Sequence, residues 1–373
     1  MSAAGERTSG SDNWQVLRER EINFTYDYRM RCEHCMVSNL MTAENYHSLS
    51  GSGMTACSGC REDFNFGPKV IDLRDLEDEA LDATKVPELA WYHTTTDPEW
   101  PRASWTLPDK ELRHLRETAC WPEEQIERHR RFYENQALHV GTYEAAIESM
   151  LRRMEEQDDR ESVFYLHRVR LRQDIRVAPD WRDENHEQAA KITWMDLAAQ
   201  NWDVIRYLNA HEAMGSISLA LVRDATASTQ QIRLPVPRLV DPHSEATLAR
   251  MRSYRKGVGE IREAAAGRAL SPLEKLRQRA AARQGELRTP EPIEVHGVLS
   301  KMGHYVADQY LAGVSPVVRH DFLHAIGGPN AENNDEADLA WLTKVANLAA
   351  LLTHADKVLN ALDNQPWQDI RPA

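Results

Sequence analysis

The sequence lacks the long apolar runs and the leader segment that would direct it into or across a membrane. Its unbroken apolar stretches fall far short of the ~18 residues that a membrane span requires, and its start, MSAAGERTSGSDNW, has no apolar signal core. An excess of positive charge is also missing. The formal net charge of −13 argues against broad nonspecific binding to a nucleic-acid backbone. We therefore expect a cytoplasmic protein that does not bind membranes.

Several familiar catalytic patterns are absent as well. The chain has no Ser, Cys or Thr nucleophile motif, and KGVGEIREAAAG lacks the strand and the full glycine pattern of a nucleotide-binding loop. His320 and His324 lie four residues apart on an expected helix, but no third metal ligand stands at a fixed spacing from them. We interpret this pair as part of a polar helix face.

The composition is that of a folded protein with more than one domain. Hydrophobic residues make up 42% and charged residues 28% of the sequence, which is typical of soluble globular proteins. The length of 373 residues suggests two or three domains. The stretches PVPRLVDP and RTPEPIEV break regular structure. The predicted units are a disordered tail (1–13), a zinc-binding module (14–68), an acidic linker (69–86), a mixed α and β domain (87–234), a linker with a helical arm (235–292) and a helical C-terminal domain (293–373).

Two cysteine pairs form the most specific local pattern in the chain. Cys32 and Cys35 precede Cys57 and Cys60 in the arrangement C-x2-C-x21-C-x2-C, which is close to the spacing of zinc ribbons and treble-clef knuckles. Four thiolates complete a tetrahedral Zn²⁺ shell and leave no position for a substrate. We therefore predict a structural zinc ion that supplies much of the folding energy of this unit. The alternative is four buried or reactive thiols.

Four stretches of the middle domain follow one another in an informative order. In ELAWYHTTTDPEW, His93 stands at the end of an apolar extended run and before a polar turn. In ALHVGTYEAAIESMLRR, His139 and Gly141 precede a helix that Thr142 can cap. SVFYLHRVRL alternates like a strand, and RYLNAHEAMGSISLALV places Glu212 before a further strand. This order resembles the ADP-ribosyltransferase fold, and in particular the rifampin ADP-ribosyltransferases and the poly(ADP-ribose) polymerase branch. The resemblance covers roughly residues 88–222 and implies an α+β fold with a mixed sheet.

The resemblance also implies site residues. In that branch the first strand carries a histidine followed by a polar pair, which is matched by His93, Thr94 and Thr95. The aromatic residue of the second strand is replaced by His139, with Tyr143 as a rival for stacking on nicotinamide. The resemblance implies that NAD is the substrate, that Glu212, His93 and His139 are catalytic, and that the NAD site is lined by His93, Thr94, His139, Tyr143 and Ser216.

The expected chemistry suits these residue types. Cleavage of the bond between nicotinamide and ribose passes through a state with oxocarbenium character, which a carboxylate such as that of Glu212 stabilises. His93 would hold a ribose hydroxyl, and His139 would pack on the nicotinamide ring. The alternative is that His93 is a satisfied histidine at a strand end, and that His211 rather than Glu212 faces the pocket.

The favoured function is mono-ADP-ribosylation of a macromolecule, with a protein acceptor favoured over a nucleic acid. The aromatic and basic segment FTYDYRMR before the first cysteine pair suits either partner, or it packs on the zinc unit itself. The alternative function is that of a noncatalytic zinc-dependent protein- or nucleic-acid-binding protein with a degenerate transferase fold. The sequence makes no prediction of the oligomeric state.

Overall fold

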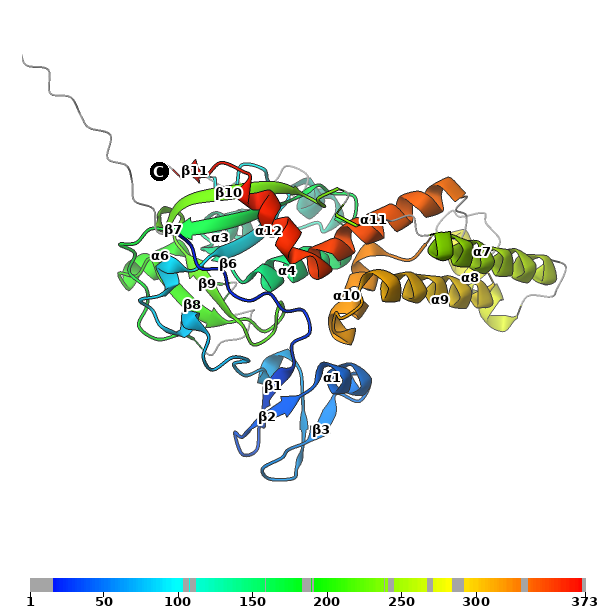
Figure 1. The fold of residues 1–373 in the computed structure, drawn as a ribbon, viewed down its shortest axis with the longest axis horizontal. Helices are drawn as coiled ribbons and strands as arrows, with labels where there is room; N and C mark the ends of the chain where they lie inside the picture. The colour runs from blue at the N-terminus through cyan, green and yellow to red at the C-terminus, as the bar shows by residue number, and fades with distance from the viewer. Residues whose placement is uncertain are drawn as a thin grey trace, which may run out of the picture.

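The computed structural model describes residues 16–370, except for 103–106, 108–111, 158, 183–188, 190, 238, 241–244, 267–270, 284–291 and 330–334. The predicted disordered tail, residues 1–13, lies outside the described residues. The fold is mixed α+β with small sheets, which confirms the α+β class (Figure 1). The mixed sheet that the resemblance implied is wrong for the described strands, because each strand pair in the two central sheets is antiparallel. None of the helices in the described parts of the chain combines the length and the apolar character needed to cross a membrane.

The four-cysteine module, residues 28–65, projects away from the sheets and long helices (Figure 1). It consists of two antiparallel hairpins and one helix: β1 (Tyr28–Arg31), β2 (Ser38–Met41), α1 (Ala43–Leu49), β3 (Met54–Ala56) and β4 (Asp63–Asn65). Tyr28, Met30 and Phe64 are fully buried within it. Phe24 and Tyr26, in the aromatic segment before β1, are also buried. This segment therefore packs inside the protein.

The segment predicted as an acidic linker forms short turns that pack on the rest of the chain. These are η1 (Pro68–Val70), η2 (Glu79–Leu81) and η3 (Val86–Glu88). The buried guanidinium of Arg206 donates hydrogen bonds to the carbonyls of Ala80 and Leu81 on one side, and to those of Ala178 and Pro179 on the other. A buried cation needs several acceptors to offset its lost hydration. Arg206 thereby ties residues 80–81 to the sheets.

Two sheets make up the central part of the chain. The first has the order β11-β10-β7-β5, and the second has the order β6-β9-β8. Their strands are antiparallel: β5 (Trp91–Thr95), β6 (Leu138–Val140), β7 (Phe164–Leu171), β8 (Val204–Leu208), β9 (Ile217–Leu221), β10 (Thr226–Leu234) and β11 (Gln368–Asp369). Tyr92 and Gly141 exchange two backbone hydrogen bonds of 2.9 Å. This bridge joins the edge of the first sheet, β5, to the end of β6.

Helix α4 (Tyr143–Glu156) begins directly after this bridge. Thr142 caps it by accepting a hydrogen bond from the backbone N–H of Ala145 at 3.1 Å, as the sequence predicted. A side chain at Gly141 would bring its Cβ within 2.9 Å of both the Ala145 Cβ and the Ser218 Oγ. The glycine therefore lets the helix start, β6 and β9 approach one another closely. The remaining elements of this region are η4 (His114–Thr118), α3 (Glu123–Glu134), α6 (Trp194–Ala199) and η5 (Arg223–Ala225).

The C-terminal region is helical and packs on α4. Its helices are α7 (Glu245–Ala265), α8 (Pro272–Arg283), α9 (Ile293–Tyr310), α10 (Pro316–Ile326), α11 (Asp335–Thr353) and α12 (Ala355–Asp363). Helices α10 and α11 contact α4, and the final strand β11 pairs with β10 of the first sheet. One hydrophobic core extends from the four-cysteine module through the sheets to these helices. Strand β11 is therefore part of the first sheet.

The hydroxyl of Tyr143 provides a test of this packing. It is buried and donates a hydrogen bond of 2.9 Å to the carbonyl of Leu351 on α11. We expect Tyr143→Phe to lower the free energy of unfolding by about 1 kcal/mol, because the substitution leaves a buried carbonyl without its donor. Chemical denaturation measures this change, with Tyr165→Phe on β7, a partly exposed position, as the control. Equal loss in the two variants would contradict a specific role for the bond.

Candidate functional site

The four cysteines of the two pairs converge on one point. Within the described residues they are the one group of three or more His, Cys, Asp or Glu side chains whose ligand atoms all lie within 4.8 Å of one another. The Sγ atoms of Cys32 and Cys60 are 3.8 Å apart, and those of Cys35 and Cys57 are 3.5 Å apart. A zinc ion with Zn–S bonds of about 2.3 Å places its tetrahedral sulfur ligands about 3.8 Å apart. The cluster therefore fits a structural zinc ion, as predicted.

Both pairs have the same local geometry. The N–H of His34 points at the Cys32 Sγ (3.4 Å), and the N–H of Gly59 points at the Cys57 Sγ (3.3 Å). Met36 and Arg61, each directly after the second cysteine of a pair, have positive φ angles of 63° and 69°. Hydrogen bonds from the Cys60 and Gly59 backbone N–H groups lower the pKa of the Cys57 thiol to about 6, which favours the thiolate that binds metal.

The histidine pair on α10 has a different arrangement. The rings of His320 and His324 lie against each other with centroids 4.3 Å apart and a tilt of 37°, and both are exposed. The Nδ1 atom of His324 lies 3.4 Å from a carboxylate oxygen of Glu155, and that of His320 lies 3.3 Å from one of Asp321. In the part of the chain that the structure describes, these side chains do not converge as metal ligands. Their exposure and their carboxylate neighbours make this part of α10 a polar surface.

A second cluster forms around His93, on the first sheet. His93 lies directly across from His167 in the pairing of β5 with β7. The ring of Trp100 stacks on that of His93 at 4.4 Å and 18°, and its centroid is 5.1 Å from the ring of His167. Burial lowers the pKa of His93 to about 3 and that of His167 to about 4. Both imidazoles are therefore neutral at neutral pH.

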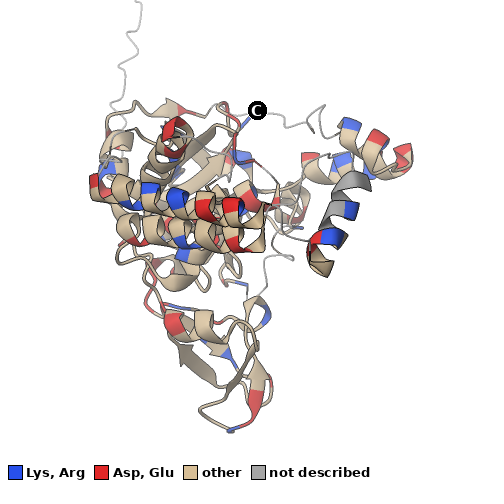
Figure 2. Cartoon of the chain, turned by 90° about the vertical axis from the view of Figure 1, so that its right-hand side faces the viewer, with Lys and Arg blue, Asp and Glu red and all other residues tan. Residues whose placement is uncertain are grey.

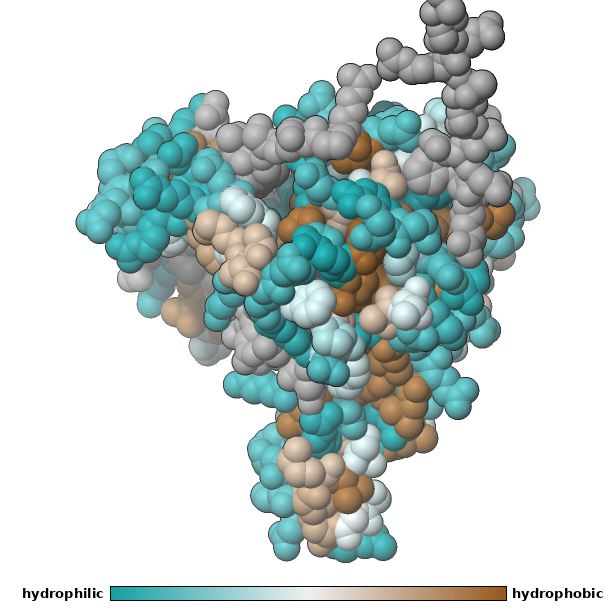
Figure 3. Space-filling model, turned by 90° about the vertical axis from the view of Figure 1, so that its left-hand side faces the viewer, coloured by the Kyte–Doolittle hydropathy of each residue, from teal (hydrophilic) through white to brown (hydrophobic). Residues whose placement is uncertain are grey.

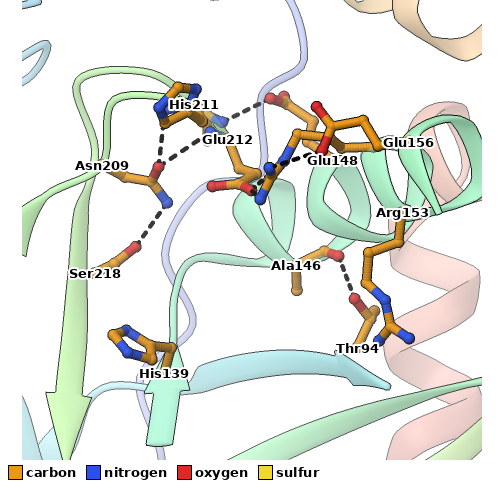
Figure 4. Close-up of polar contacts among 12 residues, drawn as sticks. Thr94, His139, Ala146, Glu148, Arg153, Glu156, Asn209, His211, Glu212 and Ser218 are labelled. Atoms are coloured by element: carbon orange, nitrogen blue, oxygen red, sulfur yellow. Dashed lines mark hydrogen bonds and ion pairs between the residues drawn. The ribbon is translucent and has the colours of Figure 1, made fainter. Parts of the chain in front are cut away.

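His139 lies next to this cluster, on β6. Its backbone hydrogen-bonds the side chain of His93. Its Nδ1 atom is 3.1 Å from the hydroxyl of Tyr207 on β8, and burial raises the pKa of that phenol well above its ordinary value. The side chain of Asn209 donates a hydrogen bond of 3.1 Å to the hydroxyl of Ser218 on β9 (Figure 4). Polar groups of β5, β6, β8 and β9 thus meet where the two sheets join.

Glu212 belongs to the loop between β8 and β9. Its backbone N–H donates to the side-chain oxygen of Asn209 at 3.0 Å, and its side chain is 4% exposed (Figure 4). The guanidinium of Arg152 on α4 binds its carboxylate through Nε at 2.8 Å and Nη2 at 2.5 Å. The neighbouring His211 is exposed. Of these two neighbours it is therefore Glu212 that turns inward, and its charge also contributes to the raised pKa of Tyr207.

Three further predicted residues occupy different positions. The hydroxyl of Thr94 donates to the carbonyl of Ala146 at 2.7 Å, on the face of β5 opposite to His93. Tyr143 is buried against Phe24 and Tyr92, and its hydroxyl donates a hydrogen bond to a carbonyl of α11. These contacts hold the fold together and do not bring either residue into the histidine cluster. The hydroxyl of Ser216 is buried and has no hydrogen-bond partner among the described residues.

Sequence reasoning missed three residues of the site: Arg152, Tyr207 and His167. Arg152 is one of several charged residues in the helix stretch, and only the fold brings it to Glu212. His167 lies in a stretch that was expected to be a strand, where the alternation of side chains indicates the face on which it lies. Strand β8, which carries Tyr207, was not predicted.

The zinc centre leads to a direct test. Protein purified without added zinc should contain about one equivalent of the metal. Cys32→Ser should lose the zinc and unfold the four-cysteine module, because the metal supplies much of its folding energy. Cys120→Ser, at an exposed cysteine outside the cluster, is the control and should retain the zinc. Metal analysis and near-ultraviolet circular dichroism measure the two effects. Stoichiometric zinc in Cys32→Ser would contradict the assignment.

The lowered pKa values of His93 and His167 predict acid sensitivity. In the unfolded chain a histidine titrates near pH 6.5, whereas in the folded protein these two bind protons only near pH 3 and 4. Protons therefore bind preferentially to the unfolded chain, and stability should fall as the pH decreases from about 6.5 towards 4. His167→Gln should make this fall shallower in thermal denaturation over that range. An unchanged slope would show that His167 is not buried in its neutral form.

Comparisons of the chain with protein-family models, with curated proteins and with solved structures find no match. A proposal of function therefore rests on the contacts among the described residues.

Proposed function

We propose that the protein transfers ADP-ribose from NAD to a macromolecular acceptor, on an ADP-ribosyltransferase-like fold formed by its two sheets. The observation that supports the proposal is the chain of contacts from His93 through His139 to Tyr207, whose pKa the charge of Glu212 also raises. His93, His139 and Tyr207 come from β5, β6 and β8, and Glu212 lies in the loop before β9.

The charges of the cluster suit a cationic substrate. The neutral imidazole of His93 would hold a ribose hydroxyl without repelling the positive charge of NAD, and His139 would pack on the nicotinamide ring. When the bond from nicotinamide to ribose breaks, its electron pair leaves with nicotinamide and positive charge develops on the ribose. The carboxylate of Glu212 would stabilise that charge. The acceptor would then attack the same carbon and lose its proton to Glu212.

Arg152 determines the orientation of the Glu212 carboxylate. Its hydrogen bond and its ion pair to the same carboxylate oxygen fix the side chain of Glu212. The same contact also favours the alternative function, because a carboxylate that is fully engaged by an arginine offers less charge to a substrate. In that case the protein is a noncatalytic zinc-dependent binding protein with a degenerate transferase fold.

We propose a protein as the acceptor. On the described helices of Figure 2, Lys and Arg are interspersed with Asp and Glu, so these helices do not carry an unbroken run of basic residues for a nucleic-acid backbone. The four-cysteine module instead exposes apolar side chains, as the lower part of Figure 3 shows. Leu40 is 73% and Met36 62% exposed. Exposed apolar groups of this kind favour contact with another protein.

Glu212→Gln is the variant that tests the proposal. The amide keeps the size of the side chain, but it removes the charge needed as the nicotinamide bond breaks. We expect NAD binding to survive and nicotinamide release to fall by about 10²-fold or more. His93→Ala should weaken NAD binding instead. Calorimetry and nicotinamide release in the presence of cell lysate measure the two effects.

Glu156→Gln is the matched control, because Glu156 binds the same Arg152 at 3.1 Å from a more exposed position. It should leave nicotinamide release near the wild-type rate. Wild-type protein that neither binds NAD nor releases nicotinamide would overturn the enzyme proposal and favour the binding protein.

A further inference from the structure

Helix α4 carries a stripe of four charged side chains at intervals of four residues. They are Glu144, Glu148, Arg152 and Glu156, and this spacing places them on one face of the helix. Glu144 accepts a hydrogen bond of 2.7 Å from the backbone N–H of Asn23, in the segment that leads to the four-cysteine module. Arg152, two turns further on, binds Glu212. The stripe therefore runs from the approach to the module to the candidate catalytic loop.

Glu148 lies between these two contacts and touches both sides. One of its carboxyl oxygens accepts a hydrogen bond of 2.5 Å from the hydroxyl of Tyr26, and the other accepts one of 2.6 Å from the backbone N–H of Ala213. Tyr26 is buried and packs edge-on against Tyr28, the first residue of β1. Ala213 directly follows Glu212. One buried carboxyl group thus connects the module to the loop, and burial raises its pKa to about 8.

A second set of contacts holds the same loop from the same side. The N–H of Arg74 donates to the carbonyl of Gly215 at 2.9 Å, and the Arg74 guanidinium lies 3.8 Å from the centre of the Tyr26 ring. Gly215 has a φ of +83°, and a Cβ there would lie 2.8 Å from the carbonyl oxygen of Asp72. Asp72 in turn pairs at 2.7 Å with Arg31, the residue directly before Cys32. The loop is therefore fitted closely against segments that the module holds.

We propose that Glu148 is a positioning residue through which the zinc-bound module holds the loop 209–216 and, with it, Glu212. Zinc binding orders the module and fixes Tyr26, Tyr26 fixes Glu148, and Glu148 fixes the N–H next to the catalytic carboxylate. Loss of zinc then disorders a loop that contains none of its ligands. The structural link stands independently of catalysis, and only its effect on turnover rests on the proposed function.

Hydrogen–deuterium exchange on the full chain tests the link. Removing zinc with a chelator should speed amide exchange in residues 209–216, and Glu148→Ala should speed it with zinc still bound. We expect the exchange rate to rise about tenfold or more in each case, as for the loss of a buried hydrogen bond to a carboxyl group. In Glu148→Ala, chelation should increase the exchange rate of residues 209–216 by a clearly smaller factor than it does in the wild-type protein, because the two changes break one connection.

Three further variants show whether the hydrogen bonds themselves matter. Glu148→Gln should restore slow exchange, because its amide oxygen can accept from Ala213 and its amide N–H₂ can donate to Tyr26. Tyr26→Phe should speed exchange and keeps the buried ring in place. Glu155→Gln on the same helix, whose carboxylate faces His324, is the control and should leave exchange unchanged. A Tyr26→Phe variant that exchanges as slowly as the wild-type protein would show that packing alone holds the loop.

Exchange and turnover separate the two proposals. If chelation leaves the exchange of residues 209–216 unchanged, or if chelation and Glu148→Ala act additively, the positioning role is overturned whatever the activity. If exchange responds as expected but the wild-type protein releases no nicotinamide, the link stands and the proposed function fails. If exchange responds as expected and the wild-type protein releases nicotinamide, Glu148→Ala should lower kcat for nicotinamide release more than it changes KM for NAD.

Discussion

The burial of helix α4 is the constraint on which the rest of the structure depends. Its apolar residues, among them Ile147, Met150 and Leu151, are almost completely removed from water. They pack between the sheet edge at β5 and the C-terminal helices α10 and α11, and the removal of apolar surface from water is the main driving force of such packing. The helix start also lies at the point where the two sheets join. A shift of α4 would therefore move the sheets, the candidate site and the C-terminal helices together.

The polar side of the same helix explains why so many distant segments meet on it. Charged groups that are taken out of water require partners, and the short segments around α4 supply them. Asn23 binds Glu144, the residues Tyr26 and Ala213 bind Glu148, and Glu212 binds Arg152. Each contact satisfies a helix side chain and fixes a loop or a chain segment at the same time. The geometry of the candidate site is thus a consequence of satisfying the polar groups of one helix.

The candidate site combines neutral and ionised groups whose state depends on their surroundings. His93 and His167 are neutral because burial opposes their charged form, and Trp100 covers them both. Glu212 keeps a charged partner in Arg152 although its side chain is buried. A cation would meet uncharged rings on one side and a carboxylate on the other. Under the proposed function, this distribution of charge would stabilise an oxocarbenium-like state.

Local patterns in the sequence determined the features whose partners are close along the chain. The cysteine spacing predicted the metal site, and Thr142 and its following apolar residues predicted α4, because knuckles and helix caps form between neighbours. The contacts of Tyr143 and Glu212 were decided only by the tertiary structure. Tyr143 matched a stacking position in the sequence, but its hydroxyl binds Leu351, 208 residues away, and Glu212 is bound by Arg152, 60 residues before it. Such pairs leave no periodic signal, because the packing of α4 against the sheets brings them together.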